Sequence, residues 1–560
     1  MAETLLLLWG KNNDGQLGNR QHSHGSPPRR HSRGRENPTS PNKGSSTTRG
    51  PPLDSSPPRN WGLSSSASTD AFSSSHAPCP VLTGSRVLQV SCGSRHTLAV
   101  VAGGEAYSWG WGACGQLGHG DDHFTGVPRV IEALKAVNNG NIVGGVKCVS
   151  AGGIHSAAVD EKGHVYTWGG SSYGQLGLGP AVTAKGMQAL PDRVMVSLES
   201  PRSSGEVGNM GMPRRTSMRQ SADVLSINET QLDRGGKIPL LARVVACGGM
   251  HTAALTEEGV VYCWGRADSG QLGIGAEWIH ETSSGVMGME WPRMVRGHLE
   301  TRRTASIACG GFHTAAVTVE GECYTWGKED YGMLGCSNEA LLKASFGRYF
   351  FCLLRTCVDT SHANPSRGSA DCGQKVTAVA CGGWHTAVIG EKGGVWTCGR
   401  GEYGRLGLGD QKSQWLLTPI DLEEREASKS TANDPASEDN PGGSIVVQAG
   451  DGGGPGIVLP PVPSPALPEP VSSGAVRSQD PATAVALGGS HSLAMTSSGR
   501  VFGFGRQEDG RLGAEVELDD DDHGAALPVE VASLQLDGWK VRSLSCGGVH
   551  SAAILTRQSE

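Results

Sequence analysis

The 560-residue sequence lacks the features that would assign it to several common protein classes. No apolar run approaches the roughly 20 residues that cross a membrane, and Leu5 to Leu8 is too short for a signal peptide. The formal net charge of −7 argues against a globally basic surface for nucleic acid. We therefore expect no membrane span and no direct DNA binding.

Signatures of catalysis and metal binding are missing as well. We find no glycine-rich phosphate loop followed by Lys and Ser or Thr, and no Cys-x-x-Cys pair of the kind that begins a zinc site. We therefore expect no catalytic residue, no metal and no cofactor.

The sequence is rich in glycine, with 83 residues, and much of it falls in one repeated pattern. A small residue, Gly-Gly, a variable residue, His and Thr or Ser precede an apolar run, an aromatic residue with Gly, and Gly-x-Leu-Gly. The repeated histidines are His96, His155, His251, His313, His385, His491 and His550. The tryptophans at the aromatic position are Trp109, Trp168, Trp264 and Trp326, with Cys398 and Phe504 in two further copies. A histidine required once per copy indicates a structural residue rather than a catalytic one.

The last copy is incomplete, and its missing part stands at the other end of the sequence. His550 lies too close to residue 560 for the aromatic strand to follow, whereas Trp9-Gly10 and a Gly-Gln-Leu-Gly open the chain. We predict that the first strand pairs with the last strands in one shared blade, because this removes open sheet edges. With four short extended runs per copy, for example 128–131, 146–151, 155–159 and 164–168, the sequence predicts an all-β, seven-bladed β-propeller of four-stranded blades over residues 1–560.

Two further residue types follow the repeat. Five cysteines stand four residues before a histidine, where other copies have Ala or Leu, so we interpret them as buried small residues in a reducing compartment, cytoplasmic or nuclear. Six copies also carry a proline, which we place at the start of an outer strand. These prolines are Pro80, Pro128, Pro191, Pro292, Pro419 and Pro528.

The run Cys247-Gly-Gly-Met-His-Thr-Ala-Ala-Leu, then Gly259-Val-Val-Tyr-Cys-Trp-Gly and Gly270-Gln-Leu-Gly, resembles the repeat of the regulator of chromosome condensation family. The resemblance covers nearly the whole chain apart from its insertions, and it implies a seven-bladed propeller. It also implies three functional classes: an exchange factor for the Ran GTPase that uses a ring face and a wedge-like insertion, an interaction propeller of signalling or ubiquitin-pathway proteins, and a plant ultraviolet-B photoreceptor.

The sequence departs from two of these classes. The wedge of the exchange factors lies in the third blade, and we find no residue-level match to it. The photoreceptor repeats carry tryptophans two residues before the histidine, where this sequence has Ser94 and otherwise glycine. We expect a monomeric, non-catalytic interaction propeller that regulates a Ran-like small GTPase as an exchange factor; the alternative is a pure scaffold or adaptor, with a photoreceptor-like protein less favoured.

The residue directly before each histidine varies between copies, whereas its neighbours hardly do. It is either a packing position or a ring of recognition residues, and aromatic and methionine side chains suit a partner interface. The candidate partner-binding residues are Arg95, Ile154, Met250, Phe312 and Trp384, with Ser490 and Val549 completing the set.

Four stretches interrupt the repeat. We expect residues 19–78 to be a disordered basic, Ser/Pro-rich insertion, 200–237 a second insertion, and 422–480 a disordered insertion rich in Pro, Gly and acidic residues. Residues 336–372 read as either an anomalous insertion or a gene-model error. The candidate phosphorylation sites, chosen from Ser-Pro pairs and an Arg-Arg-Thr-Ser run, are Ser26, Ser40, Ser56 and Ser217.

Overall fold

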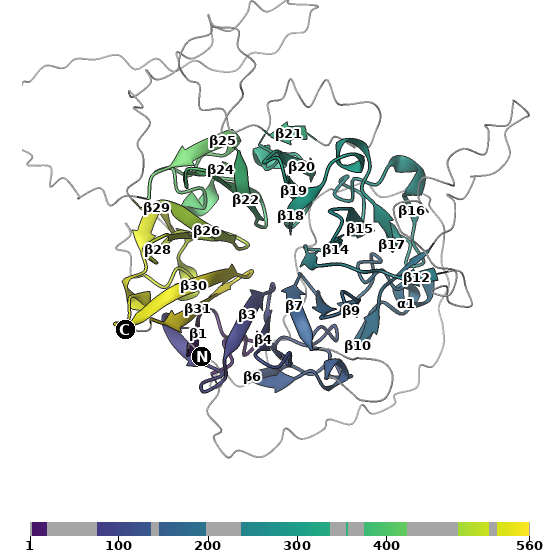
Figure 1. The fold of residues 1–560 in the computed structure, drawn as a ribbon, viewed down its shortest axis with the longest axis horizontal. Helices are drawn as coiled ribbons and strands as arrows, with labels where there is room; N and C mark the ends of the chain where they lie inside the picture. The colour runs from purple at the N-terminus through teal and green to yellow at the C-terminus, as the bar shows by residue number, and fades with distance from the viewer. Residues whose placement is uncertain are drawn as a thin grey trace, which may run out of the picture.

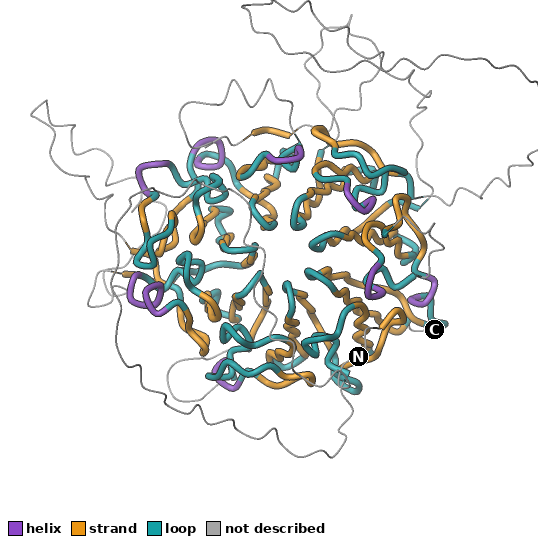
Figure 2. Tube along the Cα trace, turned by 180° about the vertical axis from the view of Figure 1, so that it is seen from behind, coloured by secondary structure: helices purple, strands orange, loops and turns teal. Residues whose placement is uncertain are grey.

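A computed structural model describes residues 3–19, 75–135, 145–197, 237–335, 354–356, 375–422, 480–514 and 523–558. Seven antiparallel sheets stand around a central axis as the blades of a ring, with the two chain ends side by side in one blade (Figure 1). Among the described residues, helix is limited to α1 (Pro180–Lys185) and short 3-10 turns, and Figure 2 shows how few they are among the strands. The predicted all-β seven-bladed propeller is confirmed.

The blades are numbered in chain order. Within each of blades 1 to 6, successive main strands lie progressively further from the centre of the ring. Blade 1 contains β3 (Val87–Cys92), β4 (His96–Val101), β5 (Ala106–Gly110) and β6 (Thr125–Val130). Blade 2 contains β7 (Val146–Ala151), β8 (His155–Asp160), β9 (Val165–Gly170) and β10 (Met187–Arg193). Blade 3 contains β13 (Val244–Cys247), β14 (His251–Leu255), β15 (Val261–Arg266), β17 (Met287–Met294) and a fifth strand, β16 (His280–Glu281).

The remaining blades complete the ring. Blade 4 contains β18 (Thr304–Cys309), β19 (His313–Thr318), β20 (Cys323–Gly327) and β21 (Leu354–Thr356). Blade 5 contains β22 (Val376–Cys381), β23 (His385–Gly390), β24 (Val395–Gly399) and β25 (Gln414–Ile420), and blade 6 contains β26 (Ala482–Leu487), β27 (His491–Thr496), β28 (Val501–Arg506) and β29 (Gly524–Glu530). A separate two-stranded ribbon joins β11 (Met195–Ser197) to β12 (Lys237–Pro239).

The closing blade combines both ends of the chain, as the sequence predicts. It contains β30 (Trp539–Cys546) and β31 (His550–Arg557) from the C-terminal end, and β1 (Thr4–Gly10) and β2 (Ser75–Val81) from the N-terminal end. β1 lies between β31 and β2, and its register runs from Thr4 opposite Thr556 to Gly10 opposite His550. The ring therefore has no open seam between its first and last strands.

The middle strands of the blades form the core because neighbouring blades cover both of their faces. Every residue of β14 is buried, and so is every residue of the equivalent β4, β8, β19, β23 and β27. Such strands read as continuous apolar runs rather than alternating ones. The aromatic position fills the gap between blades, and Trp9, Trp109, Trp168, Trp264 and Trp326 are fully buried.

Two details differ from the sequence prediction. The outer strand of a blade follows the aromatic strand in the chain, so the run that begins at Pro128 belongs to blade 1 and not to the blade of His155. The six prolines lie inside the outer strands rather than at their first residue. Several stand where the pairing register shifts, as Pro191 does, because a bulge tolerates a residue that donates no hydrogen bond.

Most of the predicted insertions lie outside the described residues, as do Ser26, Ser40, Ser56 and Ser217. Within residues 336–372 the structure describes only β21, which pairs with β20 as the fourth strand of blade 4. Among the described residues, no helix is both long and apolar enough to cross a membrane.

Candidate functional site

The seven repeated histidines form a ring of bonds between blades. Each imidazole Nε2 lies 2.8 to 2.9 Å from the hydroxyl oxygen of the Ser or Thr that follows the histidine of the next blade. His251, for example, bonds Thr314, and His550 bonds Thr97 to close the circle. All seven histidines are fully buried.

The hydroxyl partners determine which nitrogen of each histidine carries the proton. Each hydroxyl donates to the main-chain oxygen of the variable residue in a Gly-x-Leu-Gly turn, as Thr252 does to Gln175 at 2.7 Å. It has one proton to donate, so it must accept from an Nε2–H group of the histidine. Burial lowers the pKa of His251 to about 3. These neutral histidines therefore hold blades together and are not placed to act as acids or bases.

A ring of main-chain bonds lies beside the histidines. The amide of Gly249 donates to the oxygen of Gly310 in the next blade at 3.0 Å, and the equivalent bond recurs around the circle. A Cβ atom at Gly249 would lie only 2.6 Å from the oxygen of Gly311. The second glycine of the repeat is therefore favoured by close contact between blades, and blade 1 has Ser94 at this position.

Two turns of each repeat, the one before the histidine and the one after the aromatic strand, lie on the same face of the ring. In blade 3 the residue after Trp264 pairs with His251, so the turn before β14 and the turn after β15 lie at the same end of the blade. The same register holds in the other blades. We call this end the histidine face; the turns between the two middle strands form the opposite face.

The five candidate partner-binding residues lie on the histidine face, and all are half-buried. Arg95 forms a two-fold ion pair with Asp14 of the closing blade, with nitrogen–oxygen distances of 2.7 and 2.6 Å. Met250 contacts Gln175, and Ile154 packs over Gly170. Phe312 and Trp384 contact one another, with ring centroids 4.9 Å apart. The position is thus both a packing site and part of an exposed surface.

Phe312 and Trp384 belong to a continuous series of aromatic and cationic side chains across blades 2 to 5. Arg266 lies over the rings of Tyr173 and Phe312 at 5.1 and 5.4 Å. Lys328 lies over Phe312 and Trp384 at 5.5 and 5.3 Å. Tyr331 meets Trp384 edge-on at 5.9 Å and is covered by Arg400 at 4.9 Å. Aromatic and cationic side chains of this kind dominate protein interfaces.

Blades 3 to 6 share an ion pair that sequence reasoning missed. After the aromatic or Cys residue and its Gly, each of these blades has a basic residue, any residue, and an acidic one. The pairs are Arg266–Asp268 at 2.5 Å, Lys328–Asp330 at 2.7 Å, Arg400–Glu402 at 2.6 Å, and Arg506–Glu508. We call these four pairs the paired arc. Aligning the copies three residues beyond the Gly would have revealed it.

The Gly-x-Leu-Gly turns on this face have two forms. Where x is Gln, its side-chain oxygen accepts a hydrogen bond of 2.9 Å from the backbone amide two positions earlier. The donors are the amides of Asp14, Cys114, Tyr173 and Ser269. Blades 4 to 6 have Met333, Arg405 and Arg511 instead, and there the residue before the glycine adopts a left-handed conformation. The φ values are 61° for Tyr331, 64° for Tyr403 and 61° for Asp509. Tyrosine rarely adopts this conformation, so the turns of Tyr331 and Tyr403 are strained, whereas aspartate adopts it more readily.

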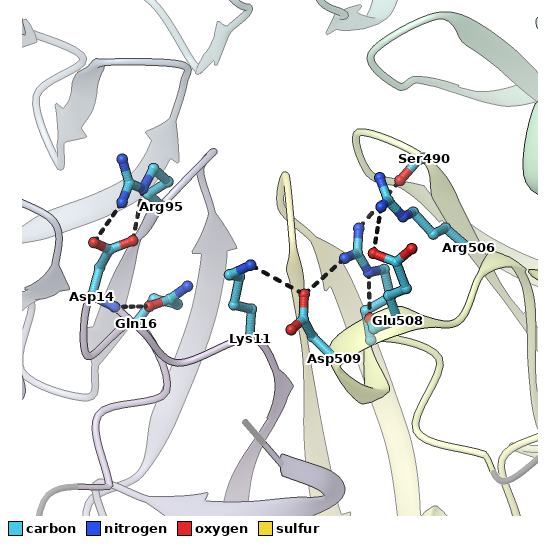
Figure 3. Close-up of polar contacts among 9 residues, drawn as sticks. Lys11, Asp14, Gln16, Arg95, Ser490, Arg506, Glu508 and Asp509 are labelled. Atoms are coloured by element: carbon cyan, nitrogen blue, oxygen red, sulfur yellow. Dashed lines mark hydrogen bonds and ion pairs between the residues drawn. The ribbon is translucent and has the colours of Figure 1, made fainter. Parts of the chain in front are cut away.

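A polar network crosses the closing seam on the histidine face (Figure 3). Lys11 of the closing blade pairs with Asp509 of blade 6 at 3.4 Å, and Asp509 also pairs with Arg511 at 3.1 Å. On the other side, Asp14 holds Arg95 of blade 1. Arg511 is almost fully buried and also donates to Ser490 at 3.2 Å. The turn after β1 is thus tied to both neighbouring blades.

A hairpin found only in blade 3, among the described residues, stands beside this face. Residues 275–287 form η3 (Ala276–Trp278) and β16, which pairs with the start of β17. Its tip contacts blade 2, where the Ser284 hydroxyl donates to the main-chain oxygen of Ser172. The buried carboxylate of Glu290 accepts the amide of Ser283 at 2.9 Å and anchors the tip from below. Glu277, His280 and Glu281 are exposed on it.

Comparison with known proteins agrees with this architecture. The family model for the regulator of chromosome condensation (RCC1) repeat matches residues 103–159, 162–203, 258–317, 320–389, 392–432 and 498–554. The ultraviolet-B receptor UVR8 of Arabidopsis thaliana is 30% identical over 354 residues, which are 62% of this chain and 62% of that protein. The human E3 ubiquitin-protein ligase HERC2 is 32% identical over 312 residues, 53% of this chain and 6% of HERC2.

Solved structures show the same fold at lower identity. Human WBSCR16 superposes with a TM-score of 0.57 and 18% identity, over 98% of this chain and 99% of WBSCR16. Prp20p of Saccharomyces cerevisiae superposes with a TM-score of 0.58 and 16% identity, over 100% of this chain and 92% of Prp20p. The chain thus spans less than two thirds of the curated relatives named above, and the repeats and their ring show its family: it belongs to the regulator of chromosome condensation (RCC1) repeat family.

Proposed function

We propose that this chain is an interaction propeller that docks a protein partner on its histidine face, and that the partner is a Ran-like small GTPase whose nucleotide exchange it promotes. The observation that carries the proposal is the hairpin of blade 3. It is a polar insertion in one copy, it lies next to Arg266 and Tyr173, and the third blade is where the resemblance to the exchange factors places a wedge.

The hairpin has the properties that such a role requires. Exchange requires preferential binding to the nucleotide-free GTPase, so the contacting element must hold its shape. Glu290 and the Ser284 contact with blade 2 hold the tip, while Glu277 and Glu281 remain exposed to a partner. Among the solved relatives, Prp20p was described together with its binding to Gsp1p and histones. The histidine face and its hairpin thus offer a partner one broad surface and one projecting element.

The test is the release of a fluorescent GDP analogue from Ran and a panel of other small GTPases, with the chain at substoichiometric concentration. We expect faster release with turnover. Substituting Glu277 and Glu281 with Ala should lower the rate at least about tenfold, which corresponds to roughly 1.4 kcal/mol. The matched control replaces Glu257 and Glu258, exposed glutamates on the opposite face of the same blade. No acceleration on any GTPase would refute exchange activity.

A scaffold or adaptor function is the second candidate. HERC2 supports it, because a propeller like this one is a small part of that much longer protein. The same hairpin and control variants, used as bait in pull-downs, separate the two functions: a scaffold retains a bound partner without changing nucleotide release. Photoreception is not proposed, because the position of the photoreceptor tryptophans is occupied here by the closely packed glycine ring and Ser94.

A further inference from the structure

Three aromatic rings form the centre of the surface between blades 4 and 5. Phe312 precedes β19, Trp384 precedes β23, and Tyr331 lies in η5 (Asp330–Gly332). Trp384 lies 4.9 Å from Phe312 and 5.9 Å from Tyr331, measured between ring centroids. Tyr331 is 40% exposed, and the other two rings are half-buried. The rings therefore form one contiguous patch with accessible edges.

The ion pairs around this patch expose their acidic members more than their basic ones. The side chain of Asp330 is 46% exposed and that of Lys328 is 32% exposed. The values are 37% and 26% for Asp268 and Arg266, and 39% and 31% for Glu402 and Arg400. The cations lie against the aromatic rings, as described above, and each leaves its paired carboxylate partly exposed. An approaching partner therefore meets partly exposed carboxylates beside aromatic rings.

Aromatic rings beside carboxylates are suited to binding a cation, and the ammonium group of Lys328 already binds in this way. Its ammonium group lies 5.5 and 5.3 Å from the centroids of Phe312 and Trp384, and 2.7 Å from the carboxylate of Asp330. Aromatic faces attract ammonium and guanidinium groups, and the stems of Lys and Arg pack on apolar rings. A second cation supplied by a partner would find the same groups.

We propose that Phe312, Tyr331 and Trp384, with Asp268, Asp330 and Glu402, bind a basic segment of the protein partner through its Lys or Arg side chains. The inference rests on the proposed docking at the histidine face and specifies the chemistry of the partner. The resident cation Lys328 competes for this surface. Its removal should therefore favour the partner, and this effect distinguishes the proposal from a simple loss of contacts.

The experiment measures binding of a fluorescent oligo-arginine peptide to the full chain by anisotropy, beside an oligo-glutamate peptide of equal length. Substituting Asp268→Asn, Asp330→Asn and Glu402→Gln together should weaken binding of the basic peptide at least about tenfold. The single substitution Lys328→Met should tighten it about threefold. The control Glu132→Gln with Glu257→Gln removes exposed carboxylates away from this surface and should leave binding unchanged.

Several outcomes would overturn the proposal. These are binding that the three substitutions leave intact in variants with unchanged melting temperatures, tighter binding of the oligo-glutamate peptide, or self-association of the chain that the three substitutions abolish. Binding of the basic peptide only after residues 20–74 are deleted would also overturn it, because the chain's own arginines would then be the occupant. Peptide binding without any nucleotide exchange would refute the exchange function and leave the basic partner supported.

Discussion

Two parts of the histidine face occupy equivalent positions of the repeat and differ in what they present. Blades 3 to 6 have the paired arc, with a basic and an acidic side chain in each copy. The closing blade and blades 1 and 2 have Lys11-Asn-Asn, Trp111-Gly-Ala and Gly170-Ser-Ser at the same positions, and we call them the plain arc. Beneath both arcs lie the same histidine bonds, with the same lengths.

This difference distinguishes the contacts that hold the ring together from side chains that only blades 3 to 6 carry. A bond that recurs in all seven blades serves the ring, whereas side chains confined to four blades serve something outside it. The left-handed turns follow a similar but narrower division. Tyr331, Tyr403 and Asp509 lie in blades 4 to 6, whereas the described Gly-x-Leu-Gly turns of blade 3 and of the plain arc have Gln at x and no non-glycine residue with a positive φ.

The largest expected effect comes from opening the seam that both arcs share. Deleting residues 1–10 removes β1, whose Leu6, Leu8 and Trp9 are buried between blades. Replacing one such Trp by Ala costs about 3–5 kcal/mol, so losing the whole strand should lower the melting temperature sharply. As a control, Trp9→Phe keeps most of the bulk and loses the bond to the Arg511 oxygen, at about 1 kcal/mol. An unchanged melting temperature after the deletion would contradict closure by β1.

The scaffold was predicted from the sequence, whereas the paired arc is visible in the aligned copies but was missed. Histidine recurs in all seven blades and tryptophan in five of them because each fills the same place between blades, so repetition alone reveals them. Phe312 and Trp384 were singled out because their position varies between copies, but the contact between their rings gives no signal in the sequence. The change from Gln to Met333, Arg405 and Arg511 is visible in the sequence, but its effect on the turn depends on a side-chain cap known only from the structure. The blade 3 hairpin was not predicted, because residues 275–287 lie between two repeat elements and match no part of the repeat.

Acid should lower the stability of the whole propeller, because the buried histidines beneath both arcs must stay neutral in the folded chain. Burial lowers the pKa of His96, His155, His251 and His550 to about 3 and that of His313 to about 4, against about 6.5 in the unfolded chain. Between these values the unfolded chain binds more protons, so stability is present above pH 6.5 and is lost as the pH falls. Each histidine contributes up to about 1.4 kcal/mol per pH unit.

Urea unfolding at pH 7.0, 6.0 and 5.5 measures this effect. We expect the free energy of unfolding to fall by several kcal/mol over this range, with the slope reduced in a His251→Gln variant that keeps one fewer titrating group. A stability that stays constant from pH 7.0 to pH 5.5 would show that the histidines are not held neutral by burial.

The smallest expected effect compares one tyrosine from each turn form. Tyr403 has a φ of 64° in its strained turn, whereas Tyr173 has no positive φ and its amide is capped by Gln175. Glycine relieves left-handed strain but adds freedom to the unfolded chain, so Tyr403→Gly should be close to neutral and Tyr173→Gly should destabilise. Tyr403→Gly loses two arginines stacked on the ring, Arg506 at 4.7 Å and Arg405 at 5.6 Å, and Tyr173→Gly loses one, Arg266 at 5.1 Å, so this loss partly opposes the expected difference. The expected difference in unfolding free energy is about 1 kcal/mol in favour of the Tyr403 variant. If the two variants lose equal stability, the left-handed turns store no strain, and the contrast between the arcs reduces to their charges alone.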